Sequence, residues 1–196
     1  MKLAQSLTAA CIALFIAAHL LAQDRRAPAP RPPAAPPPAP AEYVVGPMHV
    51  QTLPPITYLY GTARTTFADI DQPVNRFLPA LQKSADDGQI KLAGPPLFIY
   101  HDVREPNQPF TLDVGFPVAP DTRPPAQFQL RQTREFRCAT LLFTGPMSRI
   151  DRAYEKLGPG VTAAGYAPTG ETRELYLYWE KPESPNNVIQ LQMGIR

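Results

Sequence analysis

The stretch from Gln23 to Ala41 consists almost entirely of proline, alanine and arginine, and it limits which part of the chain can form a core. Proline fixes its own backbone angle and has no backbone N–H to donate, so such a run favours extended polyproline geometry. It also has no apolar face to bury. We therefore predict a semi-rigid, disordered spacer in residues 23–41 and one folded domain in residues 42–196. A domain of that length can bury a sizeable core.

The N-terminus carries a single charge, Lys2, ahead of an apolar run from Leu7 to Ala22. A short basic start, an apolar run and a small residue before a polar segment are typical of a secretory signal peptide. We expect residues 1–22 to be a signal cleaved after Ala22, in an exported protein that is periplasmic or secreted. No stable membrane span would remain after cleavage. The alternative is an uncleaved N-terminal anchor, although a spanning helix needs about 20 apolar residues.

The remaining sequence offers little to nucleic acids, metals or cofactors. The chain has 19 basic and 17 acidic residues, without the basic stripe that phosphate neutralisation requires. No cluster of histidine, cysteine and carboxylate has metal-ligand spacing, and a haem would need His49 or His101 as its axial ligand. No nucleophile elbow or glycine-rich phosphate loop is present. We therefore expect no nucleic acid partner, no metal and no cofactor, and we expect Cys138 to be a small buried hydrophobe rather than a nucleophile.

Short runs rich in β-branched and aromatic residues, bounded by Gly, Pro or Asn, predict a series of strands. The last of them alternates strictly, so its apolar residues would face one side of a sheet while Gln190 and Gln192 face the other. The predicted strands cover residues 58–60, 97–100, 110–116, 140–143, 175–179 and 188–193.

Helical periodicity predicts a first helix over about 72–87, with Asp71 as its cap and Gly88 as its stop. Pro79 predicts a bend inside this helix, or a start at Pro79 itself, because an internal proline costs about 3 kcal/mol.

A second, shorter helix is predicted over residues 148–157. Ser148 and Asp151 have the spacing of a capping box, and Gly158-Pro159 would end the helix.

The two halves of the domain share one order of elements. Residues 56–118 and residues 136–195 each read strand, helix, strand, strand, which predicts a duplicated α+β unit. We expect repeat one over about 44–119 and repeat two over about 126–196, joined into a mainly antiparallel sheet with two helices. A groove between the repeats would be the place for a small ligand.

Several phrases resemble the GyrI-like small-molecule-binding family, which includes the effector-binding domains of multidrug-responsive bacterial transcription activators. They are Gly94–Asp102, Asp113–Val118, Phe143–Met147 and Arg173–Leu177. The resemblance spans residues 44–196 and implies a duplicated α+β fold that binds small organic molecules.

Two features depart from the family pattern. The segment from Leu157 to Tyr166 is shorter than the usual second helix and loop, which predicts a more open groove. The expected signal and spacer occupy the place of a DNA-binding module, so the resemblance implies ligand binding but not the regulator role.

The resemblance implies that Glu174 is the pocket carboxylate. Alternation in its strand places Glu174 on one face with Tyr176 and Tyr178, while Leu175 and Leu177 would point toward the helices. A carboxylate removed from water is driven to take up a proton or a cation, and tyrosine rings around it would favour a lipophilic cation.

Glu174 could instead be an edge-strand glutamate on the surface, paired with Arg173 or Arg134. Aromatic residues on strands are likewise more often core than ligand contacts, and we expect about half of the candidates to reach the groove. Trp179 lies on the face opposite Glu174 by strict alternation, so it needs a bulge or a strand end to take part. The candidate ligand-binding residues are Glu174, Tyr176, Tyr100, Phe98, Tyr60, Phe116, Tyr154 and Trp179.

Three functions are compatible with these sequence features. The first is non-catalytic binding of a small hydrophobic molecule, cationic or aromatic, in the groove. The second is hydrolysis of small electrophilic compounds, in which Glu174 and a tyrosine would activate water. The third is a tethered module whose groove binds a protein partner that the sequence does not identify.

Overall fold

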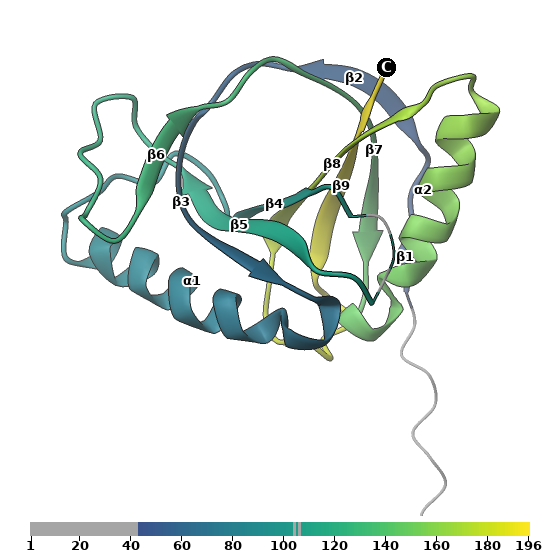
Figure 1. Ribbon diagram of the computed structural model, residues 1–196. Helices are drawn as coiled ribbons and strands as arrows, with labels where there is room; N and C mark the ends of the chain where they lie inside the picture. Colours follow the sequence, from purple (N-terminus) through teal and green to yellow (C-terminus); the bar gives the residue numbers. More distant parts are fainter. Residues whose placement is uncertain (1–42, 104, 106) are drawn as a thin grey trace, which may run out of the picture. The chain divides into compact units, whose positions relative to one another are not determined.

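The computed structural model describes residues 43–103, 105 and 107–196, which form a nine-stranded sheet and two long helices (Figure 1). The strands are β1 (Val44–Val45), β2 (His49–Leu53), β3 (Thr57–Thr65), β4 (Leu97–His101), β5 (Phe110–Pro117), β6 (Gln129–Gln132), β7 (Phe136–Thr144), β8 (Pro168–Tyr178) and β9 (Val188–Ile195). The helices are α1 (Asp71–Asp86) and α2 (Asp151–Ala163), each preceded by a 3-10 turn, η1 (Phe67–Asp69) and η2 (Met147–Arg149). The predicted signal (1–22) and spacer (23–41) lie outside the described residues and stay predictions.

All strand pairs are antiparallel, in the order β1-β7-β9-β8-β4-β5-β3-β6, with β2 pairing β7. The predicted duplication is confirmed, because β3-α1-β4-β5 is followed by β7-α2-β8-β9. The pair β4–β8 joins the two repeats at the centre of the sheet, with Leu97 opposite Leu175 and His101 opposite Glu171. The α+β fold class is therefore confirmed as well.

The strands β1, β2 and β6 were not predicted. They are short, and β2 has four exposed residues out of five. Buried and exposed residues therefore do not alternate along these strands as they do in a strand with one buried face. The strands β1 and β2 pair with successive parts of β7, and β6 pairs with β3 at the other end of the sheet. Short edge strands of this kind carry too little apolar pattern to be read from sequence.

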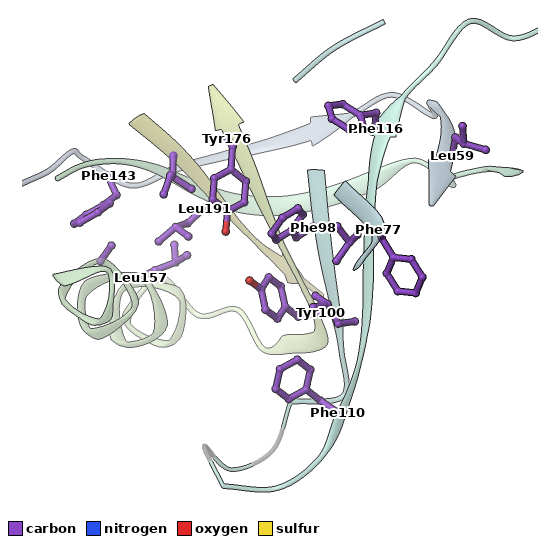
Figure 2. Close-up of a cluster of buried hydrophobic side chains, with 14 of the residues drawn as sticks. Leu59, Phe77, Phe98, Tyr100, Phe110, Phe116, Phe143, Leu157, Tyr176 and Leu191 are labelled. Carbon is purple, nitrogen blue, oxygen red and sulfur yellow. The ribbon is translucent and has the colours of Figure 1, made fainter. Parts of the chain in front are cut away.

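Both helices supply side chains to one core. The helix α1 packs on β3 and β5, and α2 packs on β7 and β9. Phe77 and Leu81 of α1 and Leu157 of α2 are buried in the core, as Figure 2 shows for Phe77 and Leu157. No helix within the described residues has the length and apolar character needed to cross a membrane.

The first helix differs in detail from its prediction. It begins at Asp71, which lies in the first turn, while Ile70 occupies the cap position without a side-chain hydrogen bond. The helix then runs through Pro79, so the alternative start at Pro79 is wrong. Phe77 and Leu81 on either side of the proline are buried, and this packing offsets the lost backbone hydrogen bond.

The second helix begins later and ends later than predicted. It covers Asp151–Ala163, and Gly158-Pro159 lies inside it, so the predicted end at Leu157 is wrong. Ser148 is part of η2 and no side-chain cap is formed, so the predicted capping box is absent from this helix. A residue before proline normally avoids the helical region because its Cβ meets the proline ring, and glycine has no Cβ. Val161, one turn after Leu157, is 0% exposed, and its burial stabilises the additional turn.

Replacing Val161 with alanine tests this extension. The change removes two buried methyl groups, so the free energy of unfolding should fall by about 2 kcal/mol. Thr162→Ala, at the exposed neighbouring position, is the control and should change the stability little. Urea unfolding of both variants measures the difference, and equal stability would mean that the helix does not pack beyond Leu157.

Candidate functional site

Glu174 lies on β8 in the middle of the sheet, opposite Phe98 of β4 and Leu191 of β9, and is 4% exposed. Three tyrosine hydroxyls donate hydrogen bonds to its carboxylate. Tyr100 and Tyr176 each reach Oε2 at 2.7 Å, and Tyr154 reaches Oε1 at 2.6 Å. The surface interpretation, with Arg173 or Arg134 as partner, is therefore wrong: Arg173 binds Glu171 instead.

The local sequence explains how these groups meet. Alternation along β8 puts Glu174 and Tyr176 on the same face of the sheet, which is the face that the helices cover. Tyr100 comes from β4, two residues after Phe98, and Tyr154 comes from α2, three residues before the buried Leu157. The carboxylate thus binds side chains of both repeats, and its donors come from two neighbouring strands and a helix.

Burial makes the three tyrosines neutral donors. It is the largest effect that raises the pKa of Tyr100, Tyr154 and Tyr176 well above the usual value for tyrosine, and the charge of Glu174 raises each pKa further. The hydroxyls therefore keep their protons at neutral pH. In Figure 2 the hydroxyls of Tyr100 and Tyr176 point into the same space between the strands and α2. We call Glu174 and its three donors the tyrosine cage.

More aromatic side chains pack around the tyrosine cage. Phe98 lies 4.6 Å from Tyr176 between ring centroids, and Trp179 meets Tyr176 edge-on at 5.6 Å. The register of β8 against β9 shifts between Tyr176 and Tyr178, just before Trp179. Phe67 of η1, which the sequence interpretation missed, stacks on Tyr100 at 6.3 Å. Trp179 and Phe67 are each 43% exposed, so the aromatic layer reaches solvent at these two residues.

Two predicted site residues lie elsewhere. Tyr60 belongs to a small cluster on the opposite face of the sheet, where its hydroxyl donates to Gln129. Phe116 is buried on the helix face but sits beside Leu59 of β3, away from Tyr176 and Tyr100 (Figure 2). Tyr60 and Phe116 therefore do not join the tyrosine cage.

The predicted orientation of the leucines in β8 is also wrong. Leu175 packs against the cluster of Tyr58, Tyr60, Leu97 and Ile99, on the face away from the helices, and Leu177 is 47% exposed. The helices cover the face of β8 that carries Glu174. This face can be buried because three tyrosine hydroxyls satisfy the Glu174 carboxylate.

A second polar cluster lies on the face away from the helices. Asp113, 2% exposed, accepts hydrogen bonds from Arg131 Nη2 at 2.7 Å and contacts His101 Nε2 at 2.8 Å. Burial alone would raise the pKa of Asp113, but the hydrogen bond with His101 and the charge of Arg131 hold it below its usual value. His101, at the end of β4, is partly buried against this carboxylate.

The remaining chemistry-bearing residues form no further site. Cys138 is 0% exposed, and burial raises the pKa of its thiol to about 11, which makes it a poor nucleophile. Within the described residues no group of three or more His, Cys, Asp or Glu side chains could hold a metal ion.

The sequence model of the GyrI-like small molecule binding domain matches residues 47–195. The chain belongs to this family. The GyrI-like match covers nearly all of the described residues, and the chain is accordingly a small-molecule-binding domain. A comparison with curated proteins returns no significant match.

Solved structures share the fold of this GyrI-like domain. The C-terminal domain of EcmrR superposes with a TM-score of 0.65 and 16% identity, covering 77% of this chain and 98% of that one. SAV2435 bound to tetraphenylphosphonium gives a TM-score of 0.56 and 11% identity, covering 76% and 94%. A hydrolase from Listeria innocua gives 0.50 and 15%, covering 76% and 91%. At identities this low, the superpositions show a common fold and nothing more.

The buried tyrosines predict a loss of stability at high pH. A pKa that is raised in the folded state means that the unfolded chain loses its protons first, from about pH 10 upward. The stabilisation is complete below that pH and disappears as the pH rises toward the folded-state values. The free energy of unfolding should therefore fall steadily above about pH 10. Denaturant titrations from neutral to alkaline pH measure it, and Tyr154→Phe should fall less steeply than the wild type.

Proposed function

We propose that this GyrI-like domain binds a lipophilic organic cation with the positive charge placed beside Glu174. One observation carries the proposal: within the part of the chain that the structure describes, a carboxylate that is 4% exposed takes its hydrogen bonds from neutral tyrosine hydroxyls alone. Among the described residues, Glu174 forms no ion pair.

Elementary electrostatics explains why such an arrangement favours a cation. Moving a carboxylate out of water costs several kcal/mol, and hydrogen bonds from neutral phenols offset this cost only in part. A cation that lies next to the carboxylate supplies the missing charge in surroundings of low polarity, where the attraction is strongest. A cation that binds beside Glu174 would therefore lower the free energy of the buried carboxylate.

The aromatic layer favours a cation that is also lipophilic. Rings of Phe98, Tyr100, Tyr176 and Trp179 present π faces and edges around the carboxylate. Such rings attract cations and bury apolar surface at the same time. SAV2435, which shares the fold, binds tetraphenylphosphonium, a cation with its charge enclosed by phenyl groups. This ligand class suits the same position in the present domain.

The half-exposed aromatics suggest the route of entry. Trp179 covers Tyr176 and Phe67 covers Tyr100, and both side chains border solvent. We infer that a ligand enters by displacing these two rings rather than by filling a space that is already open. Side chains at the surface change rotamer easily, whereas the three hydrogen-bonded tyrosines hold the carboxylate in place.

The geometry favours binding over hydrolysis. Each of the three tyrosine hydroxyls donates its proton to Glu174, so none is directed toward a substrate oxygen. A hydrolytic mechanism would need one phenol to release the carboxylate before it could polarise a substrate. Product formation that Glu174→Gln abolishes would favour the hydrolase instead.

Glu174→Gln tests the role of the carboxylate. The amide removes a buried charge, so the variant should fold and be at least as stable as the wild type. It should bind tetraphenylphosphonium more weakly by on the order of 2 kcal/mol, the usual effect of removing one side of a buried charge pair. Binding of neutral triphenylphosphine oxide should change much less. Titration calorimetry of both compounds measures this difference.

Glu155→Gln is the matched control for that experiment. Glu155 is an exposed carboxylate on α2, one position beyond Tyr154, and it pairs with Arg152 at the surface. This variant should bind the cation as the wild type does. Equal affinity of the Glu174→Gln protein and the wild type for the cation would refute the proposal.

Trp179→Leu tests the route of entry. Trp179 is the only tryptophan of the chain, so its fluorescence in the wild type reports directly on a ligand that displaces it. Its replacement should weaken tetraphenylphosphonium binding by about 1 kcal/mol, since an exposed cation–π contact is lost. Tyr43→Leu removes an aromatic of similar exposure, stacked on Phe143, and should have no effect on binding. Unchanged fluorescence at saturation would exclude entry past Trp179.

A further inference from the structure

The face of the sheet away from the helices carries a hollow of about 500 Å³. Its walls come from β4, β6, β7, β8 and β9 and from the segment that links β6 to β7. In Figure 1 this link and the link from β2 to β3 arch side by side over the sheet. Their backbones are tied together, because Thr133 N donates to Ile56 O at 2.8 Å and Ile56 N donates to Thr133 Oγ1 at 2.9 Å. The hollow thus has a fixed rim.

The lining of this hollow is rich in arginine. It includes Arg131, Arg134, Arg137 and Arg173, against two glutamates, Glu135 and Glu171. Arg131 is already paired with Asp113, and Arg173 is paired with Glu171. Arg134 forms no ion pair with any residue of the described ranges. Arg137 follows Phe136 in β7 and its guanidinium lies over the Tyr166 ring at 5.2 Å, so its side chain is directed to the other face of the sheet. The positive charge at the rim therefore comes from Arg134.

Arg173 is held rigidly in the wall. It is 5% exposed, its Nε donates to Glu171 Oε1 at 2.7 Å, and its guanidinium stacks on the Phe136 ring at 3.7 Å. An arginine carries five N–H donors in a planar fork that matches the oxygens of a carboxylate or a phosphate. The contact with Glu171 uses the Nε donor. Fixing the fork in advance lowers the entropy that an anionic ligand loses on binding.

We propose that this hollow is a second binding site, which takes a small oxyanion, a carboxylate or a phosphate ester. Arg173 forms the fixed wall, and the exposed side chain of Arg134 closes on the anion from the rim. Arg131 and His101 keep Asp113 as their partner and shape the remaining wall. This site is separate from the tyrosine cage, because Arg173 and Glu174 are consecutive residues of one strand and point to opposite faces.

The test uses NMR titration of the full chain with two probes, inorganic phosphate and succinate, at constant ionic strength. The Nε–H resonance of Arg173 should shift and saturate with at least one of them, while sodium chloride should give no saturable shift. Saturation by phosphate alone assigns a phosphate-type ligand, and saturation by succinate alone assigns a carboxylate. Shifts that only follow ionic strength with both probes would overturn the proposal.

Variants at the rim avoid disturbing the core. The variant Arg134→Gln alters an exposed position only and should weaken the saturable binding about fivefold or more. Arg152→Gln, at an exposed position of α2, is the control and should leave it unchanged. Glu174→Gln should also leave it unchanged, so this test and that of the cation site fail independently. Undiminished binding by the rim variant would likewise overturn the proposal.

Discussion

The hydrogen bonds from three tyrosines to Glu174 join both repeats of the domain and the helix α2. Tyr100 belongs to the first repeat, while Tyr154 and Tyr176 belong to the second, so one carboxylate fixes both halves and the helix α2 around itself. Main-chain pairing of β4 and β8 sets the spacing of the repeats, and the tyrosine cage sets how α2 lies on them. A buried charge held by three directed donors tolerates few other arrangements, because a lost donor in such a network leaves the charge poorly solvated. Binding chemistry and fold specificity therefore rest on the same atoms.

Much of the fold could be predicted because the long strands and helices carry clear periodicity. The residues of β5 and β9 alternate or form apolar runs between turn residues, and the stripe of α1 recurs at helical spacing. The end of α2 could not be predicted, since Gly158-Pro159 is an ordinary stop signal and only tertiary burial of Val161 overrides it. The short edge strands lack any apolar face that a pattern could reveal.

The sequence predicts which residues of one strand share a face, but it does not predict which other elements pack against that face. Alternation alone places Glu174 with Tyr176, and it cannot say which face the helices cover, so the leucines of β8 were assigned to the wrong side. The same limit applies to Tyr60: its strand has apolar residues on both faces, with Leu59 in the main core and Tyr58 in the small cluster opposite. Tyr154 and Phe67 join the site from a helix and a 3-10 turn, and their contacts depend on packing between elements far apart in sequence.

The alternation of β8 has a consequence for how this domain can vary in length. Arg173 and Glu174 follow one another, with the guanidinium on one side of the sheet and the carboxylate on the other. Inserting or deleting one residue within this strand would exchange the two, placing a cation among the tyrosines and an anion among the arginines. The tyrosine side would then bury a guanidinium without a carboxylate beside it, and Glu171 would lose its partner on the other side. Length changes are therefore confined to positions outside the central part of the strand. Such positions are the irregular pairing between Pro168 and Thr172, where Gly170 has a positive φ of 92°, and the loop between Tyr178 and Val188. In a family of such domains, this strand should keep a constant length while the segments on either side of it differ.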